Sequence, residues 1–144
     1  MRSCGKKKKH TLKSQIVINQ SNKQIICTAH SKGFEHDFSL LKTSKTYLRE
    51  ETLCLGDKGY QGIKKVHSLS LTPHKKPRKK KLSQKQKKEN QNLASIRIVI
   101  EHVYRSLKIF RILSERYRNR RKRFSLRFNL IAAIYNHELY MSSK

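Results

Sequence analysis

A lysine- and arginine-rich stretch in the middle of the chain most constrains how these 144 residues can fold. Nine of the fourteen residues from 75 to 88 are Lys or Arg, and Pro77 interrupts the stretch. Such a segment cannot bury enough apolar surface to join a core. We therefore expect residues 73–90 to form a basic, mobile loop between a strand-rich first part and a helical second part.

The first part of the chain carries short apolar segments with strand character. Residues 11–19 and 23–29 are rich in β-branched side chains and predict a hairpin. Residues 52–56 predict a third, buried strand, and residues 61–69 a short helix. Asp37 is placed to cap a further helix, which would follow it through Leu48.

The second part predicts two amphipathic helices. Apolar residues recur at steps of three and four, which is typical of one buried helical face. After Asn90 they are Ile96, Val99, Ile100, Val103, Leu107 and Phe110; between Phe124 and Tyr140 they are Leu126, Leu130, Ile131, Ile134, Tyr135 and Leu139. The order of elements predicts a mixed α/β fold without the regular alternation of a doubly wound sheet.

The charge of the chain indicates the class of partner. Lys+Arg 35 against Asp+Glu 9 gives a formal net charge of +26, which favours a polyanion, above all nucleic acid. No apolar run approaches the roughly 20 residues that span a bilayer, so we expect no membrane contact. Three scattered cysteines without a CxxC pair favour a reducing, cytoplasmic location.

Asp57 is a candidate metal ligand. It directly follows an apolar strand, where ligand sites of α/β sheets are usually found, and Gly56 and Gly59 allow a tight turn there. Carboxylate oxygens suit Mg²⁺. The alternative is that Asp57 only caps the following helix, and the residues alone leave both interpretations open.

Glu101 is the second candidate. It lies in the middle of the long helix, with Arg97 and Arg105 four residues to either side and Lys108 on the same face. This spacing favours a surface ladder of ion pairs, each worth about 0.2–0.5 kcal/mol. The functional alternative is a metal-binding glutamate whose neighbouring cations hold a DNA backbone.

Several segments together resemble the C-terminal part of DDE transposases of bacterial insertion sequences, in the group related to Harbinger-type transposases. In chain order they are SCGKKKKHTLKSQIVIN, GFEHDFSLLKTSK, LGDKGYQGI, RIVIEHVYRSLKIFRIL and RYRNRRKRFSLRFNLIAAIYNHEL. The resemblance covers nearly the whole chain. It implies that residues 1–144 are a partial DDE catalytic domain with a ribonuclease-H-like mixed sheet and surrounding helices.

In this family two aspartates and a glutamate bind a divalent cation, Mg²⁺ or Mn²⁺, and the enzymes cut DNA at transposon ends and join it to a target. The resemblance makes Asp57 the second catalytic aspartate and Glu101 the catalytic glutamate. Arg97 and Lys108 match basic positions that accompany this glutamate. Further DNA contacts are expected from the second basic cluster, which comprises Arg118, Arg120, Arg121, Lys122 and Arg123.

One feature departs from the family pattern. The first catalytic aspartate of the family lies on a central first strand upstream of the SCGKKKKHTLK segment, and residues 1–36 contain no aspartate. We therefore expect a domain that lacks this strand and is inactive alone, with an upstream transposase fragment or a second copy of the chain as partner. The alternative is a non-catalytic, basic nucleic-acid-binding protein, which would not need Asp57 or Glu101. The least favoured interpretation is a complete nuclease that uses only two carboxylates, because the chain has few acidic residues.

Overall fold

The computed structural model describes residues 12–78, 81–115 and 121–143, and its first elements are two antiparallel strands. Strand β1 (Leu12–Ile18) pairs with β2 (Ile25–Lys32), with Gln15 opposite Ala29. The predicted hairpin is confirmed. Because successive side chains of a strand point to opposite faces, Ile16 enters the main core while Gln15 is buried on the other face of β1.

Helix α1 (Asp37–Thr43) follows the hairpin and is shorter than predicted. His36 is its N-cap residue, without a side-chain cap, and Asp37 is its first helical residue. The prediction of Asp37 as the cap is therefore wrong by one position. Strand β3 (Cys54–Leu55) lies within the predicted third strand and is only two residues long.

The helix predicted over residues 61–69 is wrong. Two short 3₁₀ turns, η1 (Lys58–Tyr60) and η2 (Ile63–Lys65), are separated by Gly62, whose φ of 93° breaks any continuous helix. Strand β4 (Ser70–Leu71) follows and pairs in parallel with β3. The buried His67 side chain makes a hydrogen bond of 2.8 Å with Ser70 and supports this return of the chain.

Helix α2 (Gln84–Lys108) begins inside the basic stretch, earlier than predicted. Ser83 accepts a hydrogen bond from the backbone of Gln86, and the Gln86 side chain accepts one from the backbone of Ser83. This reciprocal pair satisfies two backbone donors at the helix start. Residues 84–90 of the predicted loop therefore belong to α2.

The chain ends with α3 (Arg111–Ser114), the turn η3 (Arg121–Arg123) and α4 (Phe124–Ser142). The predicted buried face of α4 is partly wrong. Ile131 and Tyr135 are buried as expected, whereas Leu126, Leu130 and Ile134 are exposed. The remaining buried positions of α4 are Phe124, Phe128 and Ala132.

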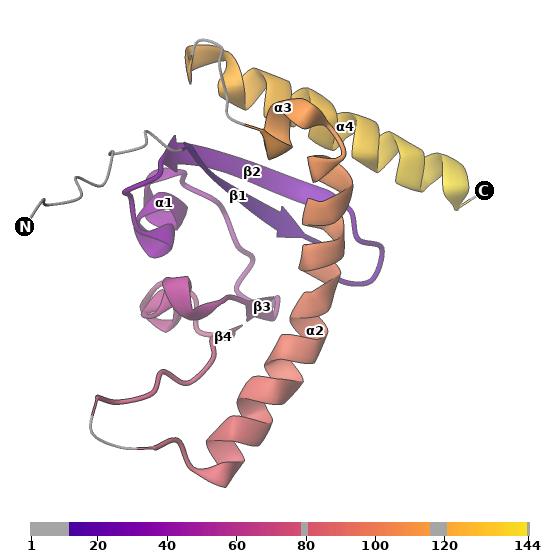
Figure 1. The fold of residues 1–144 in the computed structure, drawn as a ribbon. Coiled ribbons are helices and arrows are strands. Elements are labelled where there is room, and N and C mark those ends of the chain that lie inside the picture. Colours follow the sequence, from indigo (N-terminus) through magenta and orange to yellow (C-terminus); the bar gives the residue numbers. More distant parts are fainter. Residues whose placement is uncertain (1–11, 79–80, 116–120, 144) are drawn as a thin grey trace, which may run out of the picture.

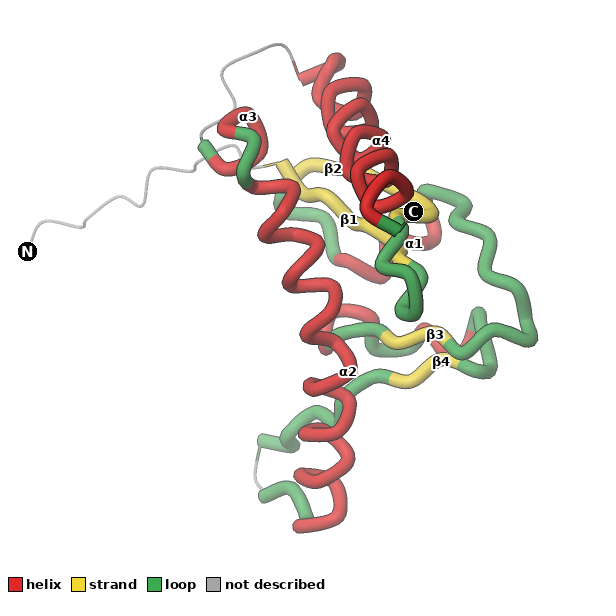
Figure 2. Tube along the Cα trace, turned by 90° about the vertical axis from the view of Figure 1, so that its right-hand side faces the viewer, coloured by secondary structure: helices red, strands yellow, loops and turns green. Residues whose placement is uncertain are grey.

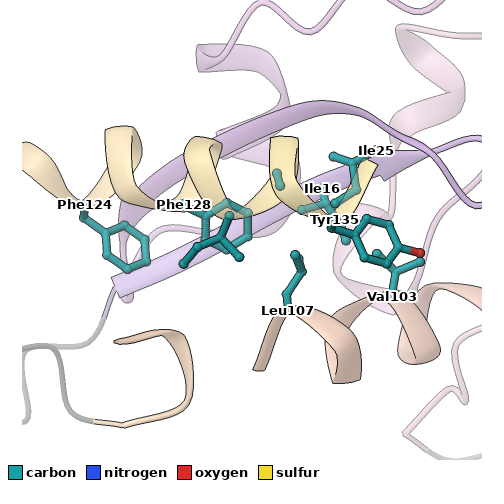
Figure 3. Packing of buried hydrophobic residues seen from close by; sticks show 9 residues of the cluster. Ile16, Ile25, Val103, Leu107, Phe124, Phe128 and Tyr135 are labelled. Carbon is teal, nitrogen blue, oxygen red and sulfur yellow. The ribbon is translucent and has the colours of Figure 1, made fainter. Parts of the chain in front are cut away.

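The main core lies between the β1–β2 hairpin and the two long helices (Figure 3). Ile16 and Ile25 contribute from the strands, and Val103 and Leu107, each 1% exposed, from α2. Phe128 and Tyr135 close it from α4 in Figure 3. Ile96, predicted on the apolar face of α2, is exposed, because the part of α2 that packs against this core begins at Ile100.

The architecture is mixed α/β, as predicted. The strands of the described residues form two separate pairs, β1–β2 and β3–β4, instead of one sheet. Helix α2 runs past both pairs, and α4 covers the hairpin (Figures 1 and 2). No helix in the described ranges is both long and apolar enough to cross a bilayer.

Candidate functional site

Asp57 follows β3 and Gly56, and its two carboxylate oxygens face different neighbours. Its Oδ1 accepts a hydrogen bond of 2.7 Å from the backbone N–H of Gly59, so Asp57 does cap the turn η1. Its Oδ2 lies 3.9 Å from Nη2 of Arg97 on α2. Capping therefore occupies only one oxygen, and the other, on a side chain that is 44% exposed, is directed toward α2.

Glu101 lies one helical turn after Arg97 on α2, and its side chain is exposed. Among the described side chains Glu101 forms no ion pair within 4.0 Å, and Arg97 contacts Asp57. The surface ladder that the spacing favoured is therefore wrong. Arg97 bridges α2 and the Asp57 turn, and Glu101 keeps a free carboxylate on the same helix.

Tyr104, one turn beyond Glu101, connects this region to β1. Its hydroxyl donates a hydrogen bond of 3.1 Å to the carbonyl oxygen of Ser14 and also interacts with the backbone of Ile16. Burial raises the pKa of Tyr104 to about 12, against the opposite effect of the Ile16 backbone. The carboxylates of Glu101, Asp37 and Asp57 add to this rise in pKa. The pKa of Tyr104 thus responds to acids from α1, from the turn after β3 and from α2.

Tyr60 is the last residue of η1, the turn that Asp57 caps. Its hydroxyl donates a hydrogen bond of 3.0 Å to Oε1 of Gln15. Burial is the main cause that raises its pKa, and the carboxylates of Asp37 and Asp57 contribute. Two tyrosine hydroxyls therefore lie in the negative field of the same carboxylates.

Asp37 also belongs to this group, although its position in the sequence favoured a role in helix capping. Its Oδ1 forms an ion pair of 3.0 Å with Nζ of Lys13 on β1, and Lys13 also donates to the carbonyl oxygen of Glu35. The Asp37 carboxylate lies directly against Gly59. The sequence shows an acid at the start of a helix, which is commonly explained by helix capping, and gives no sign of this contact.

The predicted DNA-binding residues are spread over two regions. Arg97 is at the site, whereas Lys108 is exposed at the C-terminal end of α2. Lys122 and Arg123 are exposed immediately before α4. Of the rest of the basic cluster, Arg121 opens the turn η3, and Arg118 and Arg120 lie outside the described residues.

The described part of the basic cluster does not lie at the C-terminal end of the long helix. Helix α2 ends at Lys108 and α3 follows. Lys122 and Arg123 lie at the N-terminal end of α4, where the helix dipole is itself positive. Their positive charge therefore does not stabilise α4 through the helix dipole.

The oxygen donors of Asp57 and Glu101 are of the type that Mg²⁺ and Mn²⁺ prefer, but their number is small. Within the described ranges no group of three or more His, Cys, Asp or Glu side chains is arranged to hold a metal ion. The residues present therefore fit a divalent cation in chemistry and supply only part of a coordination shell.

The sequence of this chain is similar to one family of known proteins. Residues 4–136 match the family model described as DDE superfamily endonuclease. The chain is 57% identical over 139 residues to a protein of Microchaete diplosiphon described as "Probable transposase for insertion sequence element IS702". The match covers 96% of this chain and 50% of that relative, so the chain spans about half the length of the curated relative it matches. No solved structure matches it.

Proposed function

Because this chain belongs to the DDE superfamily endonucleases, we propose that Asp57 and Glu101 are two of the three carboxylates of a transposase active site. The reaction is metal-dependent cleavage of DNA at transposon ends and joining of the freed end to a target strand. The contact between Arg97 and Asp57 carries this proposal, because it brings the helix that bears Glu101 to the turn that bears Asp57.

DDE superfamily endonucleases generally use divalent metal ions. When bound, such an ion stabilises the charge that develops on the oxygens of a phosphate during its transfer. In this chain Asp57 Oδ2 and the Glu101 carboxylate would hold it, and Arg97 would release Asp57 and take up a DNA phosphate. Before DNA binds, the Arg97 side chain would balance the negative charge of Asp57.

We infer that the third carboxylate comes from an additional strand between β1 and β3. Backbone groups of a strand alternate between its two edges. Cys54 and Gly56 donate to β4, so the backbone of Leu55 faces away from β4. At the unpaired edge of β1, the Tyr104 hydroxyl contacts Ser14 and Ile16 in place of a strand.

A strand inserted there would join the two strand pairs into one mixed sheet of the ribonuclease-H-like type. Gln15 also favours an additional segment, because its buried Nε2 has no hydrogen-bond partner among the described residues. The part of the curated relative that this chain does not match is long enough to provide such a strand. On this account the 144 residues alone are inactive, and an upstream transposase fragment or a further copy of the chain completes the site.

DNA binding would rest on the excess of positive charge. Arg97 and Lys108 on α2, the basic stretch of residues 73–90 and the cluster ending in Lys122 and Arg123 would contact phosphates without reading bases. Each phosphate contact changes log K by about −0.9 per decade of salt. The chain would accordingly be found with DNA in the cytoplasm.

The experiment is a DNA-cleavage assay with Mn²⁺. The chain is tested alone and together with the part of the Microchaete diplosiphon relative that it does not match. We expect cleavage only in the mixture, and loss of cleavage in Asp57→Asn and Glu101→Gln, with Glu115→Gln as the matched control. Cleavage by the chain alone would show that the site is complete. A mixture that binds DNA but never cleaves it, with unchanged binding by Asp57→Ala and Glu101→Ala, would instead favour the non-catalytic nucleic-acid-binding protein.

A further inference from the structure

Asp37 and Asp57 approach the same glycine from two elements that are distant in sequence. A Cβ atom built at Gly59 would lie 3.0 Å from Asp57 Oδ1 and 2.9 Å from Asp37 Cγ, and it would collide with the second oxygen of Asp37. Only a glycine lets the Asp37 carboxylate rest on this turn. The two carboxylates therefore flank one point of the turn, with no side chain between them.

Each carboxylate has its own cation on the outer side. Lys13 Nζ is 3.0 Å from Asp37 Oδ1, and Arg97 Nη2 is 3.9 Å from Asp57 Oδ2. The Asp37 charge is thus on the Oδ1 side of Asp57, and Arg97 is on the Oδ2 side. Repulsion by the Asp37 carboxylate and attraction by Arg97 both favour the orientation in which Asp57 Oδ2 points toward α2.

We propose that Asp37 is a positioning residue: its carboxylate, anchored by Lys13 and seated on Gly59, keeps Asp57 Oδ2 directed toward α2 and Glu101. This inference rests on the proposed function, because it explains how Asp57 is prepared to share a metal ion with Glu101. Groups that orient a metal ligand typically change metal affinity by about 10–100-fold when they are replaced.

The test is a Mn²⁺ titration of the full 144-residue chain, followed by paramagnetic broadening of the Lys58 backbone amide signal in NMR spectra. Asp37→Asn and Gly59→Ala should each raise the Mn²⁺ concentration for half-broadening by roughly tenfold. The double variant should be no weaker than either single variant, because both changes remove the same contact. Glu35→Gln removes an equal charge nearby and should change this concentration less than about twofold.

Lys13→Met separates positioning from simple charge. Removing a positive charge would tighten Mn²⁺ binding if only net charge mattered, whereas loss of the anchor of Asp37 should weaken it. Tighter binding by Lys13→Met, or equal effects of Asp37→Asn and Glu35→Gln, would overturn the inference. Dispersed amide spectra of every variant show that it remains folded.

A metal-free measurement distinguishes this inference from the proposed function. The side-chain nitrogen signals of Arg97 should change in Asp37→Asn and Gly59→Ala and stay unchanged in Glu35→Gln. If Mn²⁺ does not broaden the Asp57 turn of the unmodified chain, the metal site of the proposed function is wrong. If the Arg97 signals do not respond to Asp37→Asn, the positioning role of Asp37 is wrong, whether or not Mn²⁺ binds.

Discussion

Arg97 and Asp57, from a long helix and from the turn after a two-residue strand, contact each other at 3.9 Å. This distance is at the outer limit of an ion pair, and both side chains are partly exposed, so the contact adds little to stability. The contact matters because of where it places α2: it brings the helix that carries Glu101 to the turn that carries Asp57, directly after β3 and Gly56.

Replacing Arg97 by Met should separate two effects of its charge. Binding of Mn²⁺ to the Asp57 turn should become tighter, because the competing cation is gone. DNA binding should become weaker, and the slope of log K against log salt should fall by about 0.9, since one phosphate contact is lost. Both quantities are measured by titration of the chain, with fluorescence anisotropy for DNA.

The control for this prediction is Arg105→Met, two turns further along α2, where the side chain is exposed and lacks an ion pair among the described residues. It should not change Mn²⁺ binding. Equal effects of the two substitutions on Mn²⁺ binding would contradict a specific role of Arg97.

Replacing Tyr104 by Phe should expose the open edge of β1. The change removes only the hydroxyl that contacts the backbone of Ser14 and Ile16, and should lower the free energy of unfolding by about 1 kcal/mol. Urea unfolding checks this value, and Tyr47→Phe, on a side chain that is 84% exposed, should have no effect. A stability loss that persists after an upstream fragment is added would argue against a strand at this edge.

Acidification should weaken the fold through His30. Burial lowers the pKa of His30 below 6.5, and a hydrogen bond with Asn129 opposes this. The unfolded chain therefore binds the proton first as pH falls, so the free energy of unfolding should decrease below about pH 6.5 and be regained as pH rises. The imidazole ring of His30 packs against Phe124 and Phe128 at the edge of the main core.

Urea unfolding of the unmodified chain and of His30→Gln at several pH values measures this effect. The slope of stability against pH just below pH 6.5 should be smaller in the variant. An identical slope in both proteins would assign the pH dependence to other groups.

Substitution of Leu107 tests how tightly α2 packs against the hairpin in the core. It is 1% exposed, and Leu107→Ala should cost about 2–5 kcal/mol in the free energy of unfolding. Ile98→Ala, on the same helix at a position that is 51% exposed, should change stability by less than about 1 kcal/mol. Comparable losses in both variants would mean that the helix is packed differently.

The sequence correctly predicted the elements whose pattern of apolar residues can be recognised within a short segment of the chain. The alternation over β1 and β2 and the three- and four-residue steps around Val103 reflect burial of one face, and the structure confirms both elements. The start of α2 was missed because the Ser83–Gln86 capping pair lies within a run of lysines, whose charge suggested a loop. The two turns around Gly62 were mistaken for a helix because apolar spacing does not report a positive φ.

The candidate site was predictable only in part. The position of Asp57 after a strand left metal binding and helix capping both open, whereas spacing alone favoured ion pairs for Glu101. The contact that changes this interpretation, between Arg97 and Asp57, joins residues from separate elements. The position of Asp37 on Gly59 likewise depends on how α1 packs against the turn, which no local pattern encodes.

Calorimetric titration with Mn²⁺ tests the central claim most directly, in the unmodified chain and in Asp57→Asn, Glu101→Gln and the control Glu115→Gln. If Asp57 and Glu101 share one metal ion, each of the two substitutions should remove the same binding event, and the control should retain it. Binding that survives unchanged in both Asp57→Asn and Glu101→Gln would contradict the claim that this turn and this helix form one metal site.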